Sequence, residues 1–142
     1  MPALEPDEAR RRFAAARVAR LATIAPDGRP HLVPITFAVE GDRIYSIVDD
    51  VKPKSSQSLA RVRNIVANPR VSLLADEYSD NWQRLWWVRA DGTATIAPGG
   101  PERERAIGLL QSRYPPYRGA GLESGPALIV EVERWIGWSA RS

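Results

Sequence analysis

Two glycine-containing turn signals divide residues 18–48 into three short strand-like runs. Pro26-Asp27-Gly28 follows residues 18–24, and Glu40-Gly41-Asp42 separates residues 30–39 from residues 43–48. Asp-Gly and Gly-Asp pairs between β-branched runs are typical of tight antiparallel hairpins. The beginning of the chain is therefore predicted to form an antiparallel meander, which requires no crossover helix.

Further along the chain, strand-like runs alternate with segments that have helical periodicity. Helices are predicted at residues 5–17, from Ser55 to the stop signal Asn68-Pro69, and at residues 102–113. The additional strand-like runs are residues 70–75, 85–96, 127–132 and 134–139, with a bulge expected at Asp91-Gly92. We therefore expect one mainly β domain over residues 1–142, a six-stranded antiparallel β-barrel with about three helices.

The composition excludes several kinds of active site. The chain has no cysteine and one histidine, His31, which excludes thiolate chemistry, zinc–thiolate sites and multi-histidine metal sites within one subunit. Its 20 basic and 17 acidic residues are interleaved, so we expect no nucleic-acid partner. Without an apolar run of 18 residues or a signal-peptide-like N-terminus, we expect no membrane association and a cytoplasmic location.

The two lysines of the sequence, Lys52 and Lys54, directly precede Ser55 and Ser56 where a helix is predicted to begin. A helix N-terminus offers unpaired N–H groups and the positive end of the helix dipole. Ammonium and hydroxyl groups add further donors for a phosphate. The alternative is ordinary capping by one of the serines, with both lysines in solvent. The concentration of both lysines at this point favours a phosphate site.

Pro34 interrupts the strand-like run from His31 to Phe37. Because proline has no N–H to donate to a neighbouring strand, it is confined to sheet edges and bulges. This run is therefore either an ordinary edge strand or an edge on which a flat heterocycle can lie. His31 is interpreted as structural or solvent-facing, with contact to a cofactor or proton transfer as the alternative.

Tryptophan is abundant, with five residues, of which Trp82, Trp86 and Trp87 are close together in the sequence and Trp135 and Trp138 lie near its end. On a strand, Trp86 and Trp87 must point to opposite faces. One of them can join the core, whereas the other needs a subunit interface or an apolar ligand to cover it.

Several segments, taken in order, resemble the pyridoxamine-phosphate-oxidase-like split β-barrel superfamily. They are residues 18–37, 44–49, 52–54, 64–73, 89–94 and 113–117. The similarity extends over about residues 9–139, and it is greatest to a branch of probable coenzyme F420-dependent (deazaflavin) oxidoreductases. The vitamin B6 oxidase itself is a poorer match, because residues 134–139 contain no histidine where that enzyme has a substrate-binding Arg and His.

The resemblance implies a homodimer with two cofactor sites between its subunits. It implies that two strands flank the deazaflavin ring, with Pro34, Ile35 and Thr36 on one side and Ile47, Val48 and Asp49 opposite. It assigns the cofactor phosphate to the segment of Lys52 and Lys54. An aromatic lid, Trp82 or Trp138, is expected from the other subunit.

The function implied by the resemblance is hydride transfer from reduced coenzyme F420 to a small electron-poor acceptor. The proton is expected from water, His31, Tyr45 or another hydroxyl, and the substrate is left open. Arg61 and Arg63 are either contacts for the oligoglutamate tail of the coenzyme or solvated helix residues. Two alternatives remain, an FMN-dependent reductase or oxidase of the same fold and a non-catalytic module that binds flavin, heme or a tetrapyrrole.

Overall fold

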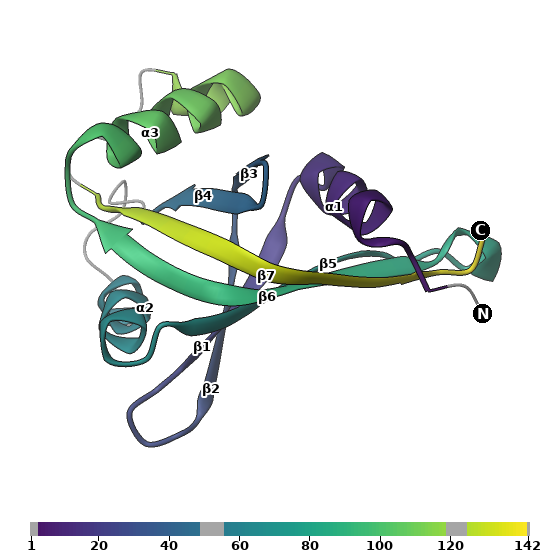
Figure 1. The fold of residues 1–142 in the computed structure, drawn as a ribbon, viewed down its shortest axis with the longest axis horizontal. Coiled ribbons are helices and arrows are strands. Elements are labelled where there is room, and N and C mark those ends of the chain that lie inside the picture. Colours follow the sequence, from purple (N-terminus) through teal and green to yellow (C-terminus); the bar gives the residue numbers. More distant parts are fainter. Residues whose placement is uncertain (1–2, 49–55, 119–124, 142) are drawn as a thin grey trace.

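The computed structural model describes residues 3–48, 56–118 and 125–141 (Figure 1). Its helices are α1 (Pro6–Ala15), α2 (Ser56–Ala67) and α3 (Pro101–Arg113), with short 3₁₀ helices η1 (Trp82–Arg84) and η2 (Pro115–Tyr117). Its strands are β1 (Ala19–Ile24), β2 (Pro30–Ile35), β3 (Ala38–Glu40), β4 (Arg43–Ile47), β5 (Arg70–Glu77), β6 (Trp86–Ala97) and β7 (Ala127–Ser139). None of the described helices has the length and apolar character needed to cross a membrane.

The strands in the described part of the chain form one antiparallel sheet of seven, in the order β2-β1-β5-β6-β7-β4-β3. β2 and β3 lie at opposite edges of this sheet, although only Thr36 and Phe37 separate them in the chain. The sheet must therefore curl until its two edges come together, which produces a split β-barrel. The predicted mainly β, antiparallel class is confirmed.

The described residues form seven strands in place of the expected six, and the strand bounds differ from the predicted runs in two places. Residues 30–39 form two strands, β2 and β3, whereas residues 127–139, expected as two strands, form the continuous strand β7. The chain breaks at Thr36-Phe37 because its carbonyl groups there accept hydrogen bonds from side chains, including the Ser46 hydroxyl at 2.8 Å and Arg113 at 2.8 Å. The predicted bulge is confirmed by a shift of the β6–β7 register between Asp91 and Gly92.

The main core fills the barrel and continues under α1. Phe13 of α1 is fully buried, and its ring centroid lies 4.8 Å from that of Phe37 and 5.5 Å from that of Trp135. A second buried cluster joins α3 to β4 and β7, with Leu110 packing beside Tyr45. Figure 1 shows α1 and α3 beside the curled sheet and α2 near its other side, close to β1 and β6.

Two residues between the end of α3 and the start of η2 hold the break between β2 and β3 in position. Arg113 donates hydrogen bonds to the carbonyl groups of Phe37 and Ala16, and its guanidinium lies 4.9 Å from the centroid of the Phe37 ring. The Tyr114 hydroxyl shares its one proton between the carbonyl groups of Phe37 at 2.9 Å and Arg17 at 3.0 Å. These contacts hold the break in the sheet in one position and thereby fix the adjacent residue, Thr36.

Candidate functional site

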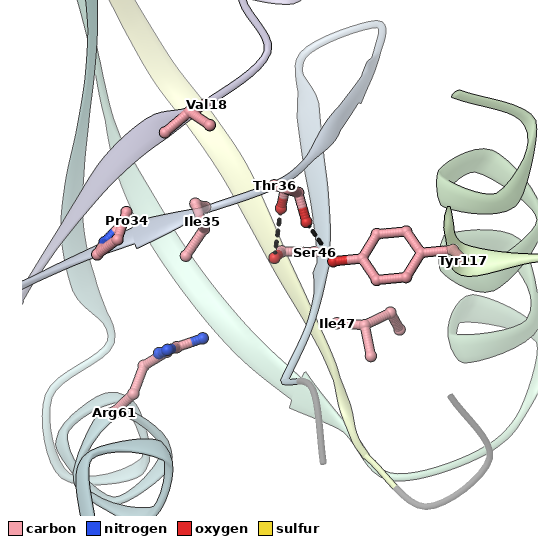
Figure 2. Close-up of a pocket in the computed structure, with 8 residues that line it drawn as sticks. All are labelled: Val18, Pro34, Ile35, Thr36, Ser46, Ile47, Arg61 and Tyr117. Atoms are coloured by element: carbon pink, nitrogen blue, oxygen red, sulfur yellow. Dashed lines mark hydrogen bonds between the residues drawn. The ribbon is translucent and has the colours of Figure 1, made fainter. Parts of the chain in front are cut away.

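A cavity of about 330 Å³ lies beside the split in the barrel (Figure 2). It is bounded by β2 and its continuation to Thr36, by β4, by α2 and by η2. Its lining residues are Val18, Pro34, Ile35, Thr36, Ser46, Ile47, Arg61 and Tyr117. This volume falls at the lower end of the roughly 300–1,000 Å³ typical of small-molecule and cofactor sites.

Arg61 carries the cation of this cavity. Figure 2 shows its guanidinium extending from α2 toward β2. The side chain is partly buried, and its Nε is a buried donor without a hydrogen-bond partner among the described residues. Burial lowers the pKa of Arg61, because loss of hydration penalises the charged form, but an arginine side chain stays protonated in proteins. Among the described residues, the cavity therefore has a positive charge without an ionic partner, which an anionic ligand group would satisfy.

Hydroxyl groups form a second polar region of the cavity. The Tyr117 hydroxyl and Thr36 Oγ1 lie 2.5 Å apart, and either can donate. Ser46 of β4 donates a 2.8 Å hydrogen bond to the Thr36 carbonyl. The apolar side chains of Ile35 and Ile47 also line the cavity (Figure 2).

Four of the residues predicted to contact a cofactor ring come together in this cavity, namely Pro34, Ile35, Thr36 and Ile47. Val48 is buried next to them in the sequence, and its N–H donates to the Pro126 carbonyl at 2.9 Å, but it does not line the cavity. His31 pairs with Thr23 in the β1–β2 register and lies outside the lining, with its Nδ1 buried and unpartnered among the described residues.

Most of the predicted phosphate segment lies outside the residues that the structure describes. Ser56 is the first residue of α2, the helix that also carries Arg61. Asp49, Lys52, Lys54 and Ser55 lie outside the described residues. Their proposed roles therefore stay predictions.

The candidate lid residues lie elsewhere on the same chain. Trp82 is 70% exposed in η1, at the tip of the β5–β6 connection, and Trp138 is half-buried opposite Trp87 in the β6–β7 register. Figure 1 shows this end of the sheet, near the chain termini, far from α2. Neither residue lines the cavity of its own chain, and closure of a partner's cavity stays a prediction.

The sequence did not identify Val18, Ser46 or Tyr117 as site residues, and it gave Arg61 and Arg63 the same two possible roles. The structure separates those two arginines, because Arg61 lines the cavity whereas Arg63 is exposed. Tyr117 reaches Thr36 across 81 positions of the sequence, so no local pattern connects them. The only signal for Tyr117 was the resemblance of residues 113–117 to the family.

A second cavity, of about 570 Å³, lies between α1, β1 and β5 and shares Val18 with the first. Two of its three arginines have protein contacts, since Arg12 pairs with Glu8 at 3.0 Å and Arg17 lies 4.5 Å from the centroid of the Tyr114 ring, whereas the third, Arg20, is exposed. The smaller cavity is the better candidate site, because four of the predicted ring-contact residues line it and because the Nε of its arginine is buried without a hydrogen-bond partner among the described residues.

The residues of the smaller cavity fit an anionic, flat, aromatic cofactor. Ile35 and Ile47 provide apolar contact for a ring, Arg61 can bind a phosphate, and hydroxyls can bond to ring heteroatoms. The fit to heme is poorer, because the one histidine of the sequence, His31, does not line the cavity and so provides no imidazole ligand for iron there.

Comparisons with known proteins agree on the fold. The sequence pattern of the pyridoxamine 5'-phosphate oxidase family matches residues 5–139. Comparison with curated proteins gives no match. A conserved hypothetical protein from Mycobacterium tuberculosis has a similar structure, with a TM-score of 0.76 and 25% identity, covering 97% of this chain and 86% of its own.

Two further solved structures share the fold. A FAD-binding protein from Mesorhizobium loti has a TM-score of 0.72 and 24% identity, covering 96% of this chain and 95% of its own. A heme storage protein from Vibrio cholerae has a TM-score of 0.70 and 16% identity, covering 96% of this chain and 95% of its own. Because the family pattern spans nearly the whole chain and the barrel agrees with it, this protein belongs to the pyridoxamine 5'-phosphate oxidase family.

Proposed function

We propose that this protein is an oxidoreductase that binds a phosphate-bearing tricyclic coenzyme in the cavity at the split of the barrel. Reduced coenzyme F420 is the proposed donor, and a small electron-poor molecule is the acceptor. The observation that carries the proposal is the Arg61 guanidinium, which is partly buried without an ionic partner among the described residues and faces an apolar, strand-lined cavity.

When bound, the coenzyme supplies the hydride and carries out the redox chemistry. The chain's own residues bind and orient it. Ile35 and Ile47 pack against the ring, and Arg61 binds the anionic group, together with the proposed phosphate residues Lys52, Lys54, Ser55 and Ser56. The resemblance adds Val48 and Asp49 near the ring. No residue of the cavity has to become covalently attached.

A flavin is the second candidate coenzyme. Arg61 can bind its phosphate, and the apolar walls of the cavity can contact its tricyclic ring, as for the deazaflavin. The similar structure from Mesorhizobium loti is that of a FAD-binding protein. The Vibrio cholerae relative suggests heme as a third ligand. The position of His31 outside the cavity argues against heme at this site.

Parallel titrations of the purified protein with oxidised coenzyme F420, FMN and heme test the proposal. We expect saturable binding of coenzyme F420, followed on addition of its reduced form and an electron-poor acceptor by oxidation of the coenzyme. Tighter binding of FMN than of coenzyme F420 would identify the coenzyme as a flavin and not a deazaflavin. Binding of heme alone, or of none of the three, would overturn the proposal.

We also propose that the protein is a homodimer and that its subunits meet on the outer face of β2, β1 and β5. Leu32 is 66% exposed and Leu74 is 40% exposed, and the β2–β1–β5 register places both on this face. Exposed charges of both signs, Arg20 and Asp76, occur on the same face. Such a surface can be complementary to a second copy of itself across a two-fold axis.

Leu32→Asp is expected to convert the dimer into a monomer, because it would bury a carboxylate in the apolar centre of the interface. Sedimentation equilibrium of the variant and the wild type measures the change. Val66→Asp is the matched control, since Val66 is 74% exposed but lies on α2. A Leu32→Asp protein that remains dimeric would place the interface elsewhere.

A further inference from the structure

The larger cavity, of about 570 Å³, meets the proposed coenzyme cavity at one shared residue, Val18. Val18 is 39% exposed, so its apolar side chain is open to contact with a ligand. Figure 2 shows Val18 and Arg61 on opposite sides of the coenzyme cavity, with Pro34 and Ile35 between them. A coenzyme whose anionic group lies at Arg61 therefore extends its ring toward Val18, where the larger cavity begins.

The larger cavity continues into another of about 240 Å³, and the two share Arg12, Glu77 and Trp86. Together they form one groove, which runs from Val18 between α1 and the β5–β6 connection to Ser139 at the end of β7. Trp86 is half-buried, and its indole N–H donates to Glu77 at 3.1 Å, which holds the ring in position. The groove therefore has a fixed aromatic side chain that can contact a flat ligand.

The groove is positively charged. Its lining has two acidic residues, Asp76 and Glu77, and five arginines, which are Arg12, Arg17, Arg20, Arg84 and Arg141. The guanidinium groups of Arg12 and Arg84 lie 3.0 Å and 3.4 Å from glutamate carboxylates. Arg20 and Arg141 are exposed, and neither forms an ion pair with an acidic side chain of the described residues. The groove therefore complements an anionic group better than a neutral one.

We propose that this groove binds the electron acceptor, and that the acceptor is a flat, electron-poor molecule with a carboxylate or phosphate group. This inference rests on the proposed function and adds the substrate class to it. The reducible end of the acceptor lies at Val18, beside the coenzyme ring, and its anionic group lies among the arginines. The acceptor there gains a hydride from the reduced coenzyme and a proton from water, a two-electron reduction that leaves the coenzyme oxidised.

Equilibrium dialysis of the coenzyme-free protein with two matched probes tests the groove directly. The probes are para-nitrobenzoate and para-nitrobenzamide, which are flat, electron-poor and similar in size but differ in charge. We expect the wild type to bind para-nitrobenzoate more tightly than the amide. Arg20→Gln should raise the Kd of para-nitrobenzoate about 2- to 5-fold, the range of an exposed ion pair. Arg29→Gln is the matched control, because Arg29 is also exposed but lies in the turn between β1 and β2, outside the groove.

Turnover gives a second readout. With the reduced coenzyme present, para-nitrobenzoate should gain a hydride and a proton, lose water and become the nitroso compound. Arg20→Gln should raise its KM by the same factor as the Kd.

The possible outcomes separate this inference from the proposed function. Equal affinity of the wild type for both probes, or an unchanged Kd in Arg20→Gln, would overturn the groove as the site of an anionic acceptor. Binding of para-nitrobenzoate by a protein that binds neither coenzyme F420 nor FMN would overturn the proposed function and, with it, the acceptor role of the groove.

Two further measurements exclude other causes of the same result. Loss of the preference for para-nitrobenzoate in Arg61→Gln would place the probe in the coenzyme cavity and would overturn the inference. Sedimentation equilibrium shows whether Arg20→Gln keeps the subunit state of the wild type, since Arg20 also lies on the proposed contact face. If that state changes, Arg61→Gln decides alone, because a preference for the anionic probe that persists in this variant comes from the groove.

Discussion

Replacing Arg61 with glutamine is expected to weaken coenzyme binding about 10- to 150-fold. Arg61 lines the cavity, and its Nε has no hydrogen-bond partner among the described residues, so a bound anion would be its main contact. A hydrogen bond to a charged group contributes about 1.5–3 kcal/mol, and each 1.4 kcal/mol corresponds to a tenfold change in Kd. Fluorescence titration of wild type and variant with oxidised coenzyme F420 at one ionic strength measures the difference.

The same helix provides the control for Arg61. Arg63 lies two positions away and is exposed, so Arg63→Gln should leave Kd within about twofold of the wild type. Thermal unfolding gives an independent readout, because removing a partly buried cation that has no ionic partner among the described residues should leave the midpoint unchanged or raise it. Equal loss of affinity in both variants would show general electrostatic attraction, and an unchanged Kd in Arg61→Gln would remove Arg61 from the site.

The sequence was sufficient to predict the strand pairing that depends on local signals. Gly28 and Gly41 adopt positive φ values of 87° and 59° in the predicted hairpin turns, a conformation that other residues rarely adopt. The bulge was predicted from the Asp91-Gly92 pair, and glycine is required there because a Cβ would lie 2.0 Å from the carbonyl oxygen of Glu131 on the neighbouring strand β7. The hairpin turns are therefore set by the turn chemistry of a few neighbouring residues.

The break between β2 and β3 could not be predicted in the same way. Residues 30–39 have continuous strand character, and Pro34, the one strand-breaking signal, lies within β2 and before the break. The break depends on Arg113 and Tyr114, which reach Phe37 from 76 and 77 positions away. Tertiary contacts of this kind override local propensity.

Some residues of the candidate site could likewise be predicted from the sequence, whereas others depend on tertiary contacts. Pro34 marked the edge strand, and the cavity forms at that strand. The resemblance contributed Ile35, Thr36 and Ile47, which the structure brings to the same cavity. Arg61 could be distinguished from Arg63 only when the helix was placed against the barrel, since one face of α2 covers the cavity. Tyr117 needed the path of η2 back to Thr36.

The second large effect is expected at the contacts that hold the break between β2 and β3 in position. Arg113→Met should lower the free energy of unfolding by about 3 kcal/mol, because it removes charged hydrogen bonds to the Phe37 and Ala16 carbonyl groups. Burial lowers the pKa of Arg113, since it penalises the charged form, and these contacts together with the aromatic faces of Phe37 and Tyr114 compensate its partly buried charge. Methionine keeps an unbranched apolar stem, so the change isolates the polar contacts.

For a chain of 142 residues, a loss of 3 kcal/mol corresponds to a fall of roughly 10 °C in Tm, measurable by calorimetry or circular dichroism. The matched control is Arg118→Met, because Arg118 is exposed and donates to two carbonyl groups close to it in the sequence, those of Gln111 at 3.0 Å and Ser112 at 3.4 Å. Its effect should stay within about 0.5 kcal/mol. Coenzyme binding should also weaken in Arg113→Met at a temperature where the variant is folded, because Thr36 and Tyr117 lose the support that positions them. A variant that unfolds within about 2 °C of the wild type and binds normally would mean that the strands hold the split without α3 and η2.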